Sequence, residues 1–195
     1  MSKKIKEKQP KKISFTKYET THIRMKRFFA LVFDWYITSM IVSLPVTFYL
    51  RNGSYLKSEM FDLTHYPFTT GLLLGLFGVV IGFIYHVIIP SFVWQGQTLG
   101  KKICKVKVVN EYGKDVDFST LFLREMVFAT FLEGGIIISA GYLRKLLPLF
   151  EFQSLYNPLM YISYALTIIS IVYAYFNPLS QSFHDKLAKT VVVNK

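Results

Sequence analysis

The sequence contains a single cysteine, Cys104, and few acidic residues, and long stretches of it carry little or no charge. One cysteine excludes an intrachain disulfide framework and a metal cluster held by several cysteines. Acidic residues number 12 against 23 lysines and arginines, and the net charge of +11 would suggest a nucleic-acid partner in a soluble protein. The charges are crowded into a few blocks, however, and 52% of the 195 residues are apolar. This segregation favours a membrane protein.

Four apolar runs approach the length that a membrane helix needs, which is about 20 residues for a hydrocarbon core of ~30 Å. They extend from about Phe28 to Leu50, Leu72 to Val93, Met126 to Tyr142 and Pro158 to Phe176. The first run is too long for the apolar part of a signal peptide and no small-residue cleavage site follows it, so we expect it to be retained. The sequence therefore predicts an all-α membrane protein with four transmembrane helices.

The distribution of lysine and arginine predicts the orientation, because these residues concentrate in cytoplasmic segments. Residues 1–27 hold ten of them, the 94–125 loop holds six and the 177–195 tail holds three, which makes 19. The 51–71 and 143–157 loops hold two each, which makes 4. Both termini are therefore predicted to be cytoplasmic. Because topology explains most of the basic charge, we do not expect nucleic-acid binding.

The first 22 residues are expected to form a basic cytoplasmic arm, followed by a membrane domain over residues 23–193. The arm is rich in lysine and lacks a sustained apolar period, which favours a solvated segment. The alternative is that its lysines contact anionic lipid headgroups. These lysines are Lys3, Lys4, Lys6, Lys8, Lys11 and Lys12.

Three ionisable residues fall inside predicted spans, where charge is costly and often functional: Asp34, His86 and Glu133. Each lies six or seven residues from the cytoplasmic end of its span, which corresponds to a depth of about 10 Å at ~1.5 Å per residue. If the spans form one bundle, the three residues can face a common polar pocket that exchanges protons or coordinates a cation. The alternative is that they satisfy one another or an arginine and only hold the bundle together. Arg27, seven residues before Asp34 on the same helical face, would favour the ionised form of nearby acids.

Glycines recur along the second span at intervals of four, three and four residues, which places them on one helical stripe. They are Gly71, Gly75, Gly78 and Gly82. Such a stripe allows another helix to approach closely, either from the same chain or from a second copy. Because a four-helix bundle leaves little room for a pathway, we expect a homodimer packed along this stripe.

The segment from Cys104 to Val109 alternates as a strand does, and Thr190–Val193 is a second short candidate strand. Both lie on the predicted cytoplasmic side, so they can pair as a two-stranded ribbon. After the turn at Asn110–Gly113, either Asp117 or Ser119 is expected to cap a helix that leads into the third span.

Three separated motifs resemble the RDD family of small membrane proteins, which is named for an arginine and two aspartates. The motifs are the Arg27–Asp34 stretch, the loop Gly96–Lys101 running into Val106–Val109 with Arg124 after it, and the tail His184–Val192. The resemblance implies that Arg27, Asp34 and Asp185 are the family's charged residues, and that the setting is the bacterial plasma membrane. Members are described as transporters, with sodium or proton exchange suggested for some. Lys189 departs from the glycine that many members have.

The sequence and the resemblance together predict a small transporter, in particular a cation/proton exchanger. In this hypothesis Asp34 alternately holds a proton and a cation, Arg27 biases its ionisation, and Asp185 with Arg124 closes the cytoplasmic mouth by charge pairing. His86 and Glu133 complete the predicted pathway. The expected partners are the lipid bilayer and a monovalent cation or small solute, with no cofactor and no metal. The alternative is a non-transporting membrane scaffold or regulator of another protein. No motif supports an enzyme.

Overall fold

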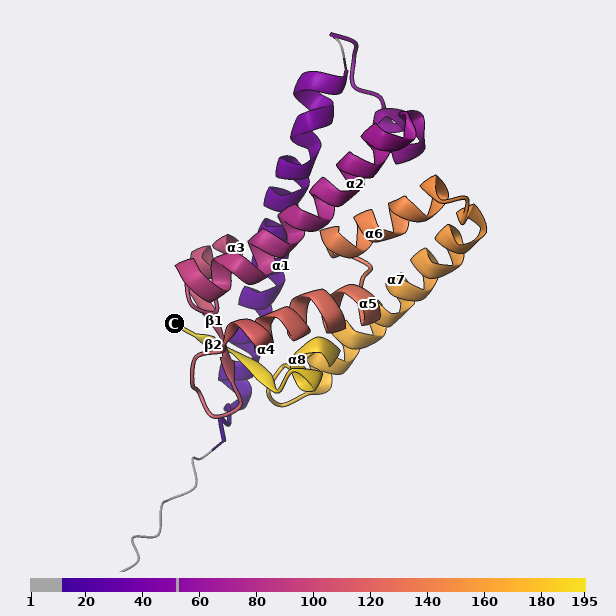
Figure 1. Cartoon of the computed structure of the whole chain (residues 1–195). Helices are drawn as coiled ribbons and strands as arrows, with labels where there is room; N and C mark the ends of the chain where they lie inside the picture. The colour runs from indigo at the N-terminus through magenta and orange to yellow at the C-terminus, as the bar shows by residue number, and fades with distance from the viewer. Residues whose placement is uncertain (1–11, 52) are drawn as a thin grey trace, which may run out of the picture.

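The protein is mostly helical, with one small sheet (Figure 1). The computed structural model describes residues 12–51 and 53–195. The predicted lysine contacts of residues 3–11 with lipid lie outside these described residues. In chain order the elements are α1 (Lys17–Leu44), η1 (Pro45–Leu50), η2 (Ser58–Phe61), η3 (Leu63–His65), α2 (Phe68–Phe83), η4 (Ile84–Val93), α3 (Leu99–Ile103), β1 (Val106–Asn110), α4 (Phe118–Phe122), η5 (Leu123–Ala129), α5 (Thr130–Leu132), α6 (Ile138–Leu149), α7 (Gln153–Phe176), α8 (Phe183–Leu187) and β2 (Thr190–Asn194). The segments η1, η4 and η5 are π-helical continuations of the α-helices before them.

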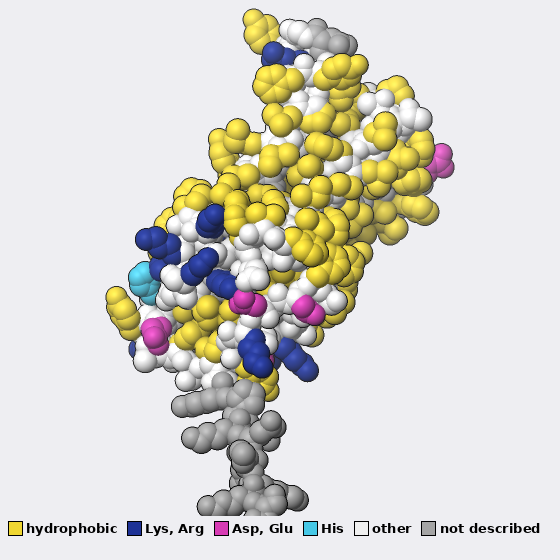
Figure 2. Space-filling model, turned by 60° about the vertical axis from the view of Figure 1, so that its left-hand side comes forward, with side chains coloured by type: hydrophobic (Ala, Val, Ile, Leu, Met, Phe, Trp, Pro, Cys, Tyr) yellow, Lys and Arg dark blue, Asp and Glu magenta, His cyan; other side chains and the backbone are white. Residues whose placement is uncertain are grey.

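Within the described residues, three helices are long and apolar enough to cross a membrane: Lys17–Leu50, Phe68–Val93 and Gln153–Phe176. The first begins inside the predicted arm, because Thr16 caps it and forms a reciprocal capping box with Glu19. Many apolar side chains on these helices are exposed, and Figure 2 shows them covering most of the upper part of the molecule, with charged side chains gathered below. An apolar surface of this extent is expected for helices that face lipid.

The predicted third span, Met126–Tyr142, is not one continuous helix. The chain is helical from Phe118 to Leu132, is irregular at residues 133–137 and becomes helical again only at Ile138. Two glycines, Gly134 and Gly135, fall in this break, and glycine lowers helix stability by about 1 kcal/mol relative to alanine. In Figure 1 the segment from α4 to α5 runs across the lower end of the long helices, whereas α6 lies beside α2.

The glycine stripe of α2 packs against α6 of the same chain. Its four members are Gly71, Gly75, Gly78 and Gly82, and all four are buried. A Cβ atom added at these positions would collide with Leu149, Leu146, Tyr142 and Ser139 respectively. The helix α6 of the same chain thus covers the stripe, so a second copy cannot pack along it and this expectation is wrong. Dimerisation through another surface stays a prediction.

The predicted ribbon is confirmed, because β1 and β2 pair antiparallel with Val108 opposite Val192. Its inner face packs on α1, where Val106, Val108 and Val192 form a buried cluster with Ala30. The start of the described chain lies at the same end, since the Ile13 amide donates to the carbonyl of Glu111 (2.9 Å). The start of the described chain, at residue 12, and the C-terminal strand therefore lie at the same end of the molecule (Figure 1).

Candidate functional site

A buried aspartate, Asp185 of α8, lies between two arginines. Its side chain is fully buried and forms ion pairs with Arg27 of α1, through Oδ2, and with Arg124 of η5, through Oδ1. The second arginine donates from both Nε (3.0 Å) and Nη2 (2.6 Å). The backbone amide and the hydroxyl of Ser182 also donate to Oδ2, at 3.1 and 2.8 Å, as the capping box of α8. Asp185 thus joins three helices that are far apart in the sequence.

Electrostatics stabilise the ionised form of this carboxylate. Burial alone would raise the pKa of Asp185, but the guanidinium groups of Arg27 and Arg124 outweigh burial and hold that pKa well below its usual value. Glu125, next to Arg124 in the sequence, is also buried and forms an ion pair with Arg124. The Nζ atom of Lys101, in α3, lies 3.8 Å from Glu125 Oε1. Burial would raise the pKa of Glu125 too, but Arg124 and Lys101 lower it to about 2. Both acids are therefore charged at neutral pH.

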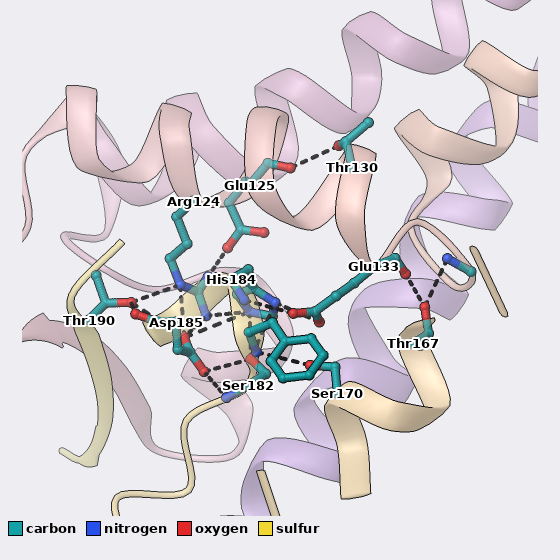
Figure 3. A network of polar contacts seen from close by, with 12 residues as sticks. Arg124, Glu125, Thr130, Glu133, Thr167, Ser170, Ser182, His184, Asp185 and Thr190 are labelled. Carbon is teal, nitrogen blue, oxygen red and sulfur yellow. Dashed lines mark hydrogen bonds and ion pairs between the residues drawn. The ribbon is translucent and has the colours of Figure 1, made fainter. Parts of the chain in front are cut away.

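Glu133, the last residue before the glycines of the break, pairs with His184 (Figure 3). Its Oε2 lies 2.8 Å from His184 Nδ1, and its Oε1 accepts a hydrogen bond from the His184 amide at 2.7 Å. The other ring nitrogen of His184 lies 3.0 Å from Arg124 Nη2. A continuous series of polar contacts thus connects the break in the third predicted span with the Asp185 cluster.

The irregular backbone of this break is satisfied by side chains from α6 and α7. Arg144 donates to the Gly134 carbonyl (2.8 Å) and to Ser163 Oγ (3.1 Å). Thr167 Oγ1 donates to the carbonyl of Glu133 and accepts from the amide of Gly135. Buried backbone outside a regular helix needs partners of this kind, because its polar groups are otherwise left unsatisfied.

Asp34 lies in a second, separate cluster on α1. Its Oδ1 accepts hydrogen bonds from the Tyr85 hydroxyl (2.6 Å) and the Gly100 amide (2.8 Å), and its Oδ2 accepts one from Thr98 Oγ1 (2.6 Å). The Thr98 hydroxyl also caps α3. A Cβ atom at Gly100 would lie 2.6 Å from Asp34 Oδ1, so only glycine allows this approach. Asp34 therefore anchors α3, and with it the loop that precedes the ribbon, onto α1.

The common pocket predicted for Asp34, His86 and Glu133 is not formed as expected. Glu133 belongs to the His184 network and Asp34 belongs to the α3 anchor. The side chain of His86 makes no hydrogen bond with residues 12–51 and 53–195. The reason is the break in the third predicted span, which places Glu133 beside α8 rather than on a straight helix facing α1. Four of the predicted site residues do share one network: Arg27, Arg124, Asp185 and Glu133.

Sequence reasoning missed several members of these clusters. Glu125 and His184 were not singled out as pathway residues, and neither were Tyr85 and Thr98. Two signals were readable: the capping pattern from Ser182 to Asp185, and the glycine pair after Glu133, which marks a helix end rather than a span centre. Of the two predicted caps, Asp117 and Ser119, the structure has Asp117, whose side chain accepts from the Thr120 amide at 3.0 Å. No group of three or more potential metal ligands is brought together in the described part of the chain.

Three long apolar helices, a buried charge network at one end and a two-stranded ribbon define a multi-pass membrane protein. Residues 23–189 match the model of the RDD family, so the chain belongs to this family. The chain is also 28% identical over 94 residues to "Uncharacterized protein YckC" of Bacillus subtilis (strain 168), an alignment that covers 45% of this chain and 62% of that protein. No solved structure matches the chain.

Proposed function

We propose that the protein lies in a bacterial plasma membrane with both termini in the cytoplasm and with four crossings, the third of them divided. Lys17–Leu50, Phe68–Val93 and Gln153–Phe176 make three crossings. The third in chain order consists of α5, the break at 133–137 and α6. The 19 to 4 division of lysines and arginines supports this orientation. The beginning of α1 and the strand β2 lie at the same end of the molecule, which also supports it, since an even number of crossings returns the chain to its starting side.

Within this topology we propose that the protein exchanges a monovalent cation for a proton. The observation that carries this proposal is the Glu133–His184 pair, because carboxylate and imidazole side chains in contact form the proton relays of many pumps and transporters. The pair lies at a helix break, and discontinuous helices line the ion sites of many transporters. Its contact with Arg124 links it to the buried Asp185 cluster, which would sense the change of charge.

The proposal gives Asp34 a different part from the one expected from the sequence. Three donors already occupy its two oxygens, so a cation would have to displace at least one of them. Asp34 is therefore the anchor of α3, and the Glu133–His184 pair takes the place of Asp34 in the proposed proton relay. Arg27, Arg124 and Asp185 hold the cytoplasmic ends of the helices together.

The test uses purified protein in liposomes that contain a trapped pH dye, to which sodium, potassium or lithium is added. We expect a cation-driven pH change with the wild type and with the control Glu59→Gln, whose side chain is exposed. Glu133→Gln should abolish the change at equal abundance, because it removes the carboxylate that contacts His184 in the proposed proton relay. Equal pH changes with the wild type and Glu133→Gln would contradict the proposed proton site.

A specific observation favours a second candidate, the non-transporting scaffold or regulator. Asp34 and Asp185 are both buried and fully engaged, as expected of groups that only hold a fold together. In that case no cation changes the internal pH, and Asp34→Asn and Asp185→Asn lower the abundance of the protein. Neither candidate involves a catalysed reaction.

A further inference from the structure

A small polar cleft lies at the end of the molecule opposite the ribbon. It has a volume of about 260 Å³ and lies between the segment that connects α1 with α2, the end of α6 and the beginning of α7. Its polar side chains come from Ser58, Asp62, Lys145, Gln153 and Tyr156. In the proposed topology this end faces the outside of the cell.

The cleft contains one group of each charge, and each has unused hydrogen-bonding capacity. Lys145 donates to the Phe61 carbonyl (3.1 Å) and has no carboxylate within ion-pair distance in the described chain, so two of its three donors remain. Asp62 uses Oδ1 to accept from the amide and the hydroxyl of Thr64, whereas Oδ2 has no partner among the described residues. Both charged groups are thus held in place with a side open for a ligand.

Neutral polar groups complete the lining. The side chains of Ser58, Gln153 and Tyr156 make no hydrogen bond within the described residues, and all three line the cleft. Five side chains from three segments therefore converge with donors and acceptors that nothing else in the described chain uses. A few convergent polar groups in a concave site are typical of small-molecule recognition.

Contacts within the chain hold the segments that form the walls of the cleft. The Tyr66 hydroxyl donates to the Met60 carbonyl (2.8 Å), and Leu63 is only 2% exposed and contacts the glycine stripe of α2. Lys145 itself ties this segment to α6 and lies 5.1 Å from the centroid of the Tyr142 ring. A preformed site loses less conformational entropy when it binds.

We infer that this cleft binds a small zwitterionic solute, one that carries a carboxylate and an ammonium group in a single molecule. Lys145 binds the carboxylate, Asp62 binds the ammonium group, and Gln153 and Tyr156 hydrogen-bond the remaining polar atoms. A volume of about 260 Å³ corresponds to roughly nine water molecules at ~30 Å³ each, which suits a molecule of the size of an amino acid. An ion of one charge would satisfy one side chain and be repelled by the other. The inference does not depend on cation/proton exchange.

The test measures binding of L-alanine and L-glutamine to the full chain in nanodiscs by isothermal titration calorimetry, with acetate and methylammonium as single-charge controls. We expect saturable binding of at least one zwitterion, at least tenfold tighter than that of either control ion. Lys145→Gln and Asp62→Asn should each weaken binding at least fivefold. The asparagine retains an oxygen that can accept from Thr64, and the glutamine retains a donor for the Phe61 carbonyl.

Lys57→Gln is the matched control, because it removes one positive charge from the same segment without altering the cleft lining. Its binding should equal that of the wild type. Tyr156→Phe removes one hydroxyl group and should weaken binding at least twofold, which provides a second test if a charge variant fails to fold. The inference is overturned if neither zwitterion binds at about 10 mM, a concentration that would nearly saturate a site with a dissociation constant of about 1 mM. It is also overturned if the folded cleft variants bind as the wild type does. Either outcome leaves the proposed proton site at Glu133 to its own test.

Discussion

Replacing Asp185 with asparagine tests whether the buried charge network determines the stability of the fold. The carboxylate is fully buried and accepts from two arginines, including Arg124 Nη2 at 2.6 Å, and from Ser182. Asparagine has nearly the same size, but it leaves both guanidinium groups without their shared counter-ion. Removing one partner from a buried ion pair costs about 3–5 kcal/mol, and we expect a loss of this size in the free energy of unfolding.

The assay is unfolding of the purified protein by sodium dodecyl sulfate in mixed micelles, followed by circular dichroism. Asp115→Asn is the matched control, because Asp115 pairs with Lys107 at 2.6 Å but its side chain is 50% exposed. Exposed pairs contribute about 0–1 kcal/mol, so this variant should unfold almost as the wild type does. Equal losses in the two variants would refute the reasoning, since burial would then make no difference.

The pH dependence of the same variant gives an independent check. An aspartate in an unfolded chain has a pKa of about 3.9, and that of Asp185 in the fold is well below its usual value. Its contribution to stability is therefore fully present above about pH 4 and is lost as the pH falls through the folded pKa. The difference in unfolding free energy between the wild type and Asp185→Asn should stay constant from pH 7 to about pH 5 and shrink only in stronger acid.

Three further predictions concern other parts of the structure. Gly78→Ala should destabilise the protein by about 1–3 kcal/mol in the same unfolding assay, because the added Cβ collides with Tyr142 of α6. Gly141→Ala is its control: the added Cβ meets no neighbouring group within 4 Å, so this variant should be neutral or slightly stabilising. Arg144→Met should cost about 1–3 kcal/mol, because it leaves the buried Gly134 carbonyl without its donor. An unchanged unfolding midpoint would show that water replaces this donor. Glu125→Gln should reduce stability at neutral pH, and its difference from the wild type should disappear as the pH falls from about 4.3 towards 2, since the folded pKa is about 2.

Much of the fold follows from patterns that the sequence displays directly. The two-stranded ribbon was predictable from the alternation around Val106 and Val108 together with the apolar end of the tail. Three of the four apolar runs correspond to long helices. These features depend on local periodicity, which a single sequence contains.

The course of the third predicted span could not be inferred in the same way. Hydropathy averages over the break at 133–137, because its residues are glycine and isoleucine apart from Glu133. The break is stable only because Arg144 and Thr167 supply hydrogen bonds from helices that come later in the chain. Such tertiary compensation leaves no periodic pattern, although the adjacent glycines indicated a weak point in the helix.

For the candidate site, likewise, the sequence indicates which residues are of interest but not which residues they contact. Arg27, Asp34 and Asp185 were identifiable as the charged residues of interest, but their partners were not. The distance along α1 between Arg27 and Asp34 is about 10 Å at ~1.5 Å per residue, so one helical face presents both side chains at two different levels. The helix α8 contacts α1 at the level of Arg27, and α3 contacts it at the level of Asp34.

The helix α1 therefore organises the end of the molecule that carries the ribbon. Thr20 donates to the Pro178 carbonyl (3.0 Å), Arg27 donates to the Ser180 carbonyl (2.5 Å), Ala30 packs on the ribbon and Asp34 holds α3. These contacts fall on one buried face of the helix at successive turns. The tail, the ribbon and the 94–104 loop thus each depend on α1 and only secondarily on one another. A proton bound by the Glu133–His184 pair would act on α8, which contacts α1 through Asp185. The proposed exchange would in this way be coupled to the helix ends beside the ribbon, without any displacement of Asp34.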